Sequence, residues 1–362
     1  MKIFAWLAAV AVFAQAPPSG SWQLQYFYDK DDSSLVLIDL KFFDRNRGMA
    51  AGYIEEKSKG KPSALITADG GVTWKLEPLK EPPRSLFVLD DSHAWMVTDK
   101  GVWKTDEAGR SWRKIARREG LLRVHFLDAQ RGWGVGAPKQ FLQTTDGGRT
   151  WNPVRVQAEA KTTPEFTAYT FIDFSDGANG IVTGWSAPPR WRSRLPSWME
   201  PDIASRRRQL PTLSLMLSTA DGGKTWNGSS TSAFGRIVCL RASDRPPLLL
   251  VEYQDAFDWP AEVMVVDARA GRNASVFRQR DRAVTDVAGI QGVAYLAAIE
   301  PAGQVRSSPI PGRLHVLTSR DLKTWEEAEV DYRAVGARAF LARMGGDLWV
   351  ATDTGMILKR TP

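Results

Sequence analysis

Short apolar segments alternate with polar turns along most of the chain. Leu35–Phe43, Met49–Glu56 and Ala64–Ala68 show the pattern: each has the length of a strand, and residues such as glycine, aspartate or serine follow it. Segments of this length, bounded by turn residues, predict β strands. We therefore expect an all-β protein built from many short strands.

One turn recurs along the sequence. Thr67–Trp74 reads Thr-Ala-Asp-Gly-Gly-Val-Thr-Trp, and close copies occupy Thr144–Trp151 and Thr219–Trp226. A weaker copy, Thr105–Trp112, has glutamate in place of the aspartate, and Ser319–Trp325 is a shortened copy. The aspartate can accept local N–H groups, the glycines tolerate positive φ, and the tryptophan can pack between neighbouring units. Because the copies repeat the same pattern, we interpret its residues as scaffold rather than as catalytic or metal-binding groups: Asp69, Trp74, Glu107, Trp112, Asp146, Trp151, Asp221, Trp226, Asp321 and Trp325.

The spacing of the turns predicts the architecture. Trp74, Trp112 and Trp151 are separated by 38 and 39 residues, a period that suits a four-stranded propeller blade. Counting strands onward predicts seven blades, of which the fifth has lost the turn and the seventh runs out of chain one strand short. The isolated strand Trp22–Tyr28 is expected to fill that vacancy by pairing with Met356–Thr361, which closes the ring. A six-bladed count would require discarding one segment that lacks the turn.

The repeat resembles the Asp-box (BNR) repeat of β-propellers such as sialidases and sortilin-type receptors. The preceding pattern, Phe126-Leu-Asp128 followed by Gly132-Trp133, looks most like the photosystem II stability/assembly factor family. The resemblance covers most of residues 35–361. It implies a seven-bladed β-propeller with Asp-box hairpins and a role in holding or assembling another protein.

Composition and charge narrow the choice of partner. The 362 residues carry a formal net charge of +7, which suits a polyanionic partner. The arginines are dispersed apart from one cluster, so we expect no nucleic-acid partner. The single cysteine, Cys239, excludes an intramolecular disulfide and lies in an apolar run, where we expect a buried strand residue.

The amino-terminal residues predict export. Residues 1–16 contain Lys2, an apolar run from Ile3 to Phe13 and then small residues, as in a secretory signal peptide. The run is short for a membrane anchor, and no other such run occurs. We therefore expect residues 17–362 to form one domain with no transmembrane segment, exported to the periplasm or the extracellular space.

Extra length between strands predicts where a binding site lies. Four insertions, Lys57–Ser63, Ser186–Pro211, Gln254–Ala261 and Pro301–Arg313, are expected on the rim opposite the repeated turns, and loops on a rigid scaffold commonly carry recognition. The longest insertion interleaves arginine with tryptophan, two residue types enriched at binding hot spots. It is the candidate surface for an acidic protein or an anionic glycan, through Arg190, Trp191, Arg192, Arg194, Trp198, Arg206, Arg207 and Arg208. The alternatives are a solvated basic loop, or a site at the channel mouth near Lys41, Arg123 and His125.

The sequence offers little for catalysis. The three histidines fall in different blades without metal-ligand spacing, and no phosphate-binding loop or nucleophile motif occurs. A sialidase would carry an Arg-Ile-Pro-type motif before the first repeated turn; the nearest match, Arg194-Leu-Pro196, lies in the wrong blade. We therefore expect a non-catalytic binding or assembly scaffold with no catalytic residue, metal or cofactor. The alternative is a glycoside hydrolase whose paired carboxylates converge across blades.

Overall fold

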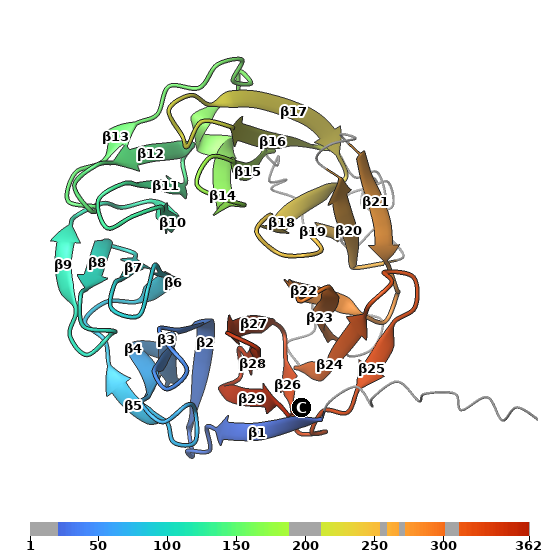
Figure 1. Cartoon of the computed structure of the whole chain (residues 1–362). Coiled ribbons are helices and arrows are strands. Elements are labelled where there is room, and N and C mark those ends of the chain that lie inside the picture. The colour runs from blue at the N-terminus through green and yellow to red at the C-terminus, as the bar shows by residue number, and fades with distance from the viewer. Residues whose placement is uncertain (1–20, 188–210, 254–258, 268–271, 301–310, 362) are drawn as a thin grey trace, which may run out of the picture.

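The computed structural model is a ring of seven antiparallel sheets around a central channel (Figure 1). It describes residues 21–187, 211–253, 259–267, 272–300 and 311–361. The predicted all-β, seven-bladed propeller is confirmed, and the six-bladed count is wrong. Turns of only a few residues join the strands within most blades, so each sheet is an up-and-down meander.

The strands divide among the blades as follows. Blade 1 contains β2 (Ser33–Phe42), β3 (Gly48–Glu56), β4 (Lys59–Thr67) and β5 (Lys75–Pro78). Blade 2 contains β6 (Pro83–Val88), β7 (Ala94–Thr98), β8 (Gly101–Thr105) and β9 (Arg113–Ala116). Blade 3 contains β10 (Leu121–Phe126), β11 (Gly132–Gly136), β12 (Gln140–Thr144) and β13 (Asn152–Pro153). A short 3-10 helix, η1 (Pro164–Phe166), leads into blade 4, which contains β14 (Thr167–Phe174), β15 (Gly180–Ser186), β16 (Thr212–Thr219) and β17 (Asn227–Ala233).

The remaining blades follow the same order. Blade 5 contains β18 (Gly235–Arg241), β19 (Leu248–Tyr253), β20 (Ala261–Asp267) and β21 (Arg272–Phe277). Blade 6 contains β22 (Ala283–Ile290), β23 (Val293–Ile299), β24 (Gly312–Ser319) and β25 (Glu326–Ala328), and the short β26 (Val335–Gly336) also pairs with β24. Blade 7 contains β27 (Ala339–Met344), β28 (Asp347–Thr352), β29 (Met356–Arg360) and the amino-terminal β1 (Trp22–Phe27).

The two ends of the chain close the ring together. β1 pairs with β29 from Trp22 opposite Arg360 to Phe27 opposite Met356, as predicted. The Trp22 N–H donates to Glu329 O at 3.1 Å, which ties β1 to blade 6 as well. Closure leaves the last blade with four strands and hides a sheet edge that would otherwise be exposed.

The repeated turns are held by their own side chains. In the first copy, Thr67 Oγ1 accepts the Gly71 N–H at 2.8 Å, and Asp69 Oδ1 accepts the Thr73 N–H at 2.9 Å. The hydroxyl of Thr73 donates to the other oxygen of Asp69 at 2.5 Å. The copies at Asp146 and Asp221 repeat this set of bonds. These aspartates are therefore used within the turns that they stabilise.

One predicted insertion is wrong. Lys57–Ser63 is not a loop, because β3 and β4 stay paired up to Glu56 and Lys59. Only Lys57 and Ser58 form the turn, and both have positive φ. The strands of blade 1 are simply long. Most of the other three insertions, residues 188–210, 254–258 and 301–310, lies outside the described residues.

Candidate binding site in the central channel

The innermost strands present two rings of side chains to the channel. Six of these seven strands carry a β-bulge. Side chains alternate along a strand, so the residue after each bulge and the residue two further on face the same way. With the matching positions of β27, the first channel ring is Asp39, Ser85, Arg123, Phe171, Cys239, Asp286 and Leu341, and the second is Lys41, Phe87, His125, Asp173, Arg241, Ala288 and Arg343. They line a cavity of about 450 Å³.

Two carboxylates of the first channel ring join neighbouring blades. Asp39 accepts the Leu86 N–H of blade 2 at 2.8 Å and the ammonium group of Lys41 at 2.5 Å. Asp286 accepts the Leu341 N–H of blade 7 at 2.9 Å. Burial alone would raise the pKa of Asp39, but Lys41, the field of Arg123 and the backbone bond outweigh it and hold the pKa below its usual range. Asp39 is therefore charged, and its oxygens are used in hydrogen bonds that hold the scaffold together.

Two further carboxylates make the same kind of contact. Asp173 accepts the Ala242 N–H of blade 5 at 3.0 Å, and Asp244 accepts the Gly289 N–H of blade 6 at 2.8 Å. Burial raises the pKa of both carboxyl groups. These four carboxyl groups therefore form hydrogen bonds that hold adjacent blades together.

His125 sits in an apolar part of the second channel ring. Its ring lies between Phe87 and Phe174, with centroid distances of 4.8 and 5.0 Å. Burial lowers the pKa of His125 to about 4, although its Nδ1 is 3.9 Å from an oxygen of Asp173. The imidazole is therefore neutral at pH 7.

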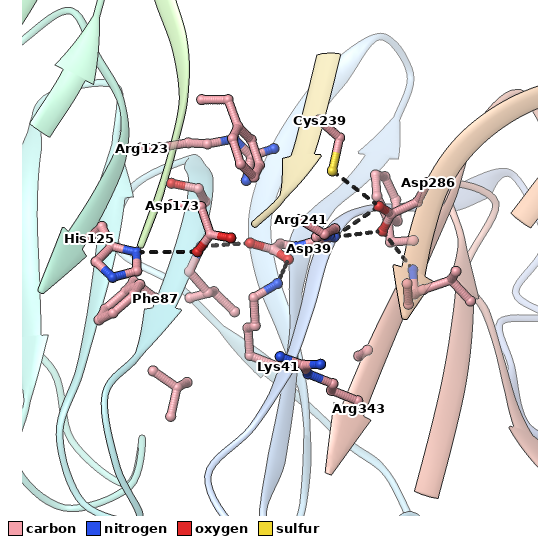
Figure 2. A pocket seen from close by; sticks show the side chains of 18 of the residues that line it. Asp39, Lys41, Phe87, Arg123, His125, Asp173, Cys239, Arg241, Asp286 and Arg343 are labelled. Carbon is pink, nitrogen blue, oxygen red and sulfur yellow. Dashed lines mark hydrogen bonds and ion pairs between the residues drawn. The ribbon is translucent and has the colours of Figure 1, made fainter. Parts of the chain in front are cut away.

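The cations of the channel differ in how they are paired (Figure 2). Arg241 contacts Asp286 at 2.8 Å, and Arg343 contacts Asp244 at 2.7 Å. Arg123 lies over the ring of Phe171 at 5.5 Å and makes no ion pair with a described residue. Its guanidinium group can therefore meet an anionic group of a ligand without first breaking an ion pair.

Cys239 is confirmed as a buried strand residue. It belongs to β18, and burial raises the pKa of its thiol to about 12. Its sulfur lies 3.9 Å from Asp286 Oδ1. A thiol with such a high pKa is a poor nucleophile at neutral pH.

The structure brings together one of the two predicted sites. Lys41, Arg123 and His125 line the same cavity, as the channel alternative expected. The arginine–tryptophan insertion, Arg190 to Arg208, lies outside the described residues. His93 and His315 are elsewhere; His315 lies between Glu300 and Glu327 in blade 6. In the described part of the chain, no group of three or more histidine, cysteine or acidic residues could hold a metal, and no helix is long and apolar enough to cross a membrane.

Sequence reasoning missed the channel acids. Asp39 stands between Ile38 and Leu40, and Asp286 lies in the apolar run of β22. A charged residue inside an apolar strand is costly unless it is paired, so this pattern was the available signal. What it could not show is which blade supplies the partner.

Comparisons with known proteins agree with the fold. The chain is 25% identical over 268 residues to photosystem II stability/assembly factor HCF136 of Arabidopsis thaliana, covering 65% of this chain and 55% of that protein. It is 23% identical over 193 residues to the photosystem II assembly lipoprotein Ycf48 of Synechococcus sp. strain CC9902, covering 51% and 48%. The chain thus spans about half the length of these two relatives. No family model matches it.

Other similarities are more distant. A segment of 96 residues is 28% identical to the vacuolar protein sorting/targeting protein 10 of Verticillium alfalfae, covering 25% of this chain and 7% of that one. A structure of YCF48 bound to a D1 peptide has a TM-score of 0.61 at 16% identity, with 96% and 97% of the two chains covered. A streptogramin B lyase has a TM-score of 0.57 at 11% identity, with 94% and 97% covered. The resemblance to photosystem II assembly factors is confirmed, while the fold itself also occurs in an enzyme.

Proposed function

We propose that this protein is an exported, non-catalytic scaffold that holds another protein during assembly. Two relatives that match half of this chain or more are photosystem II assembly factors, and a structurally similar protein has been solved with a bound peptide. The export part of the proposal is supported by the sequence of residues 1–16.

One observation carries the non-catalytic part of the proposal. The four channel acids that bond across blades, Asp39, Asp173, Asp244 and Asp286, each accept a backbone N–H of the next blade. A glycoside hydrolase needs one carboxyl group to donate a proton and a second to attack or activate water. Carboxylates already bonded to the backbone of the next blade are poorly placed for either role, so the geometry favours binding over hydrolysis.

The partner is proposed to present an acidic surface, with an anionic glycan as the second candidate ligand. The net charge of +7 favours such a partner through long-range attraction. Arg123 offers a cation without an ion-pair partner among the described residues. Blades built from short turns form a rigid ring, which suits a platform that binds without changing shape.

The test is a capture experiment with a paired activity measurement. Residues 17–362 are immobilised and exposed to an envelope extract from native cells, and the retained proteins are identified by mass spectrometry. The same preparation is incubated with aryl glycosides of neutral and acidic sugars. We expect specific capture of a protein, weakened by salt, and no glycoside turnover. Turnover that Asp173→Asn abolishes, without specific capture, would contradict the scaffold role.

A further inference from the structure

Six blades place a tryptophan at the start of their fourth strand. These residues are Trp22, Trp74, Trp112, Trp151, Trp226 and Trp325. In blade 5 the fourth strand, β21, begins Arg272-Asn273, and the only tryptophan of that blade, Trp259, precedes its third strand. The repeat is therefore broken at one position of the ring.

The tryptophan of each blade packs toward the preceding blade. Trp226 contacts Trp133 of blade 3 with ring centroids 6.2 Å apart, and Trp74 contacts Trp349 of blade 7 at 6.3 Å. In blade 6, Trp325 contacts Phe277 of blade 5 at 5.3 Å. The missing tryptophan of blade 5 would thus belong to the interface between blades 4 and 5, which are neighbours in the ring (Figure 1).

A cleft of about 400 Å³ lies at that interface. Blade 5 forms its apolar wall, which includes Ile237, Leu249 and Met264. Blade 4 contributes the short side chains of Ser214 and Thr231, which leave the space open. The volume lies within the range of pockets that hold drug-sized groups.

Aromatic side chains also line the cleft. One of them is Trp259, and the guanidinium group of Arg278 lies over its ring at 3.9 Å. Arg278 in turn lies 3.8 Å from Glu262. Phe234, also in the lining, is 49% exposed. The cleft therefore combines a preformed apolar wall with aromatic side chains.

We propose that this cleft binds an indole side chain of the protein partner, which takes the place of the tryptophan that blade 5 lacks. The neighbouring interfaces show that the fold accommodates an indole there, and Ser214, Thr231 and Asn273 supply polar atoms that can meet the indole N–H. Tryptophan inserted into a preformed pocket is typical of the residues that dominate binding energy. The inference rests on the proposed scaffold role, because it requires a protein partner.

The experiment fills the cleft from within. The probe is N-acetyl-tryptophanamide, titrated against residues 17–362 and followed by the chemical shifts of backbone amides in β17, β18 and β20. Asn273→Trp places an aromatic group in β21, where Asn273 is exposed. Ser214→Trp fills the cleft from the opposite wall, where Ser214 is buried, and serves as a second variant because the new ring at position 273 could point away from the cleft. The matched control is Asn152→Trp, at an exposed position of β13 in a blade that already has Trp151.

We expect the probe to bind saturably to the wild type and to Asn152→Trp. Its affinity should fall at least tenfold in Asn273→Trp or Ser214→Trp, while the melting temperature of that variant is unchanged or raised. Capture of the partner should fall in the same variants. No saturable binding to the wild type, or binding that both filling variants leave intact, would overturn the inference. Probe binding with partner capture unaffected by the filling variants would also overturn it. Failure to capture any partner would instead contradict the proposed function.

Discussion

The indole of Trp95 lies flat on the ring of Phe126 in the next blade, with centroids 3.7 Å apart and planes 9° apart. Its Nε1 donates to the carbonyl of Gly147, in the repeated turn of that same blade, at 2.9 Å. Trp151 completes the group with an edge contact to Phe126 at 6.1 Å. Trp133, Phe174 and Trp226 form a similar three-ring group one blade further on, as do Trp349, Phe42 and Trp74 between blades 7 and 1, although in both groups the first two rings are tilted by 32° rather than stacked flat. The repeated tryptophan is therefore one of three rings that join adjacent blades.

The first prediction concerns this packing. Trp226 is 1% exposed and Trp151 is half-buried. Trp226→Ala should lower the free energy of unfolding by about 3–5 kcal/mol, because it opens a cavity at the interface of blades 3 and 4. Trp151→Ala should cost less. Urea unfolding followed by circular dichroism measures both.

Asp146→Asn serves as the comparison for the same repeat. It weakens bonds within one turn and leaves the rings in place, so its effect on stability should be smaller than that of either tryptophan variant. Partner capture should be unchanged. Loss of capture with unchanged stability would show that the repeated turns belong to the binding site and are not only structural.

The sequence predicted the parts of the fold that are local. The turn at Asp69 and the tryptophan after it are encoded within eight residues, so their recurrence predicted the blades and the strand left over at Trp22. The channel is not local: Arg241 and its partner Asp286 are 45 residues apart and meet only because adjacent blades stand side by side. The length of β3 and β4 was also missed, since a two-residue turn at Lys57 and Ser58 carries no glycine or asparagine.

The second prediction concerns closure of the ring. Deleting residues 17–28 removes β1, including the buried Trp22, and exposes the edge of β29. The shortened protein should melt at a lower temperature and aggregate, because an unpaired strand edge pairs with other molecules. Calorimetry and light scattering would show both effects. An unchanged melting temperature would mean that β1 contributes nothing to closure.

The third prediction concerns pH. The pKa of His125 is about 4 in the folded protein and about 6.5 in an unfolded chain, so the unfolded state binds more protons between these values. Stability from the neutral imidazole is therefore present above pH 6.5 and is lost as pH falls toward 4. His125→Phe keeps a ring between Phe87 and Phe174 and should reduce this loss by about 2–3 kcal/mol.

The measurement is the free energy of unfolding of both proteins at pH 7.5 and pH 4.5. The raised pKa of Asp173 acts in the opposite direction, because a carboxyl group that protonates more readily in the folded state gains stability as pH falls. Both proteins keep Asp173, so their difference reports mainly on His125. Equal losses in the two proteins would mean that His125 is not the group that titrates.

The last prediction separates the two candidate surfaces for an acidic partner. Replacing Arg190, Arg192 and Arg194 with alanine should abolish partner capture at low salt and leave the melting temperature nearly unchanged. Wild-type capture should weaken as salt rises, because exposed charges are screened beyond about 8 Å at physiological ionic strength. The control removes three exposed arginines elsewhere, Arg45, Arg110 and Arg149, and matches the loss of charge. It should retain capture, since its arginines lie in turns at the opposite rim.

Undiminished capture by the first triple variant would indicate that the partner binds at the channel instead. There Arg123→Gln is the informative change, because Arg123 makes no ion pair with a described residue. Asp39 would lose the field of Arg123 but keep its hydrogen bonds to Lys41 and to the Leu86 N–H. Lys41→Gln would instead release Asp39, whose buried carboxylate depends on that ammonium group, and would destabilise the protein for reasons unrelated to binding. Loss of capture in Arg123→Gln at an unchanged melting temperature would place the acidic partner at the channel. Loss in the first triple variant alone would place it on the rim.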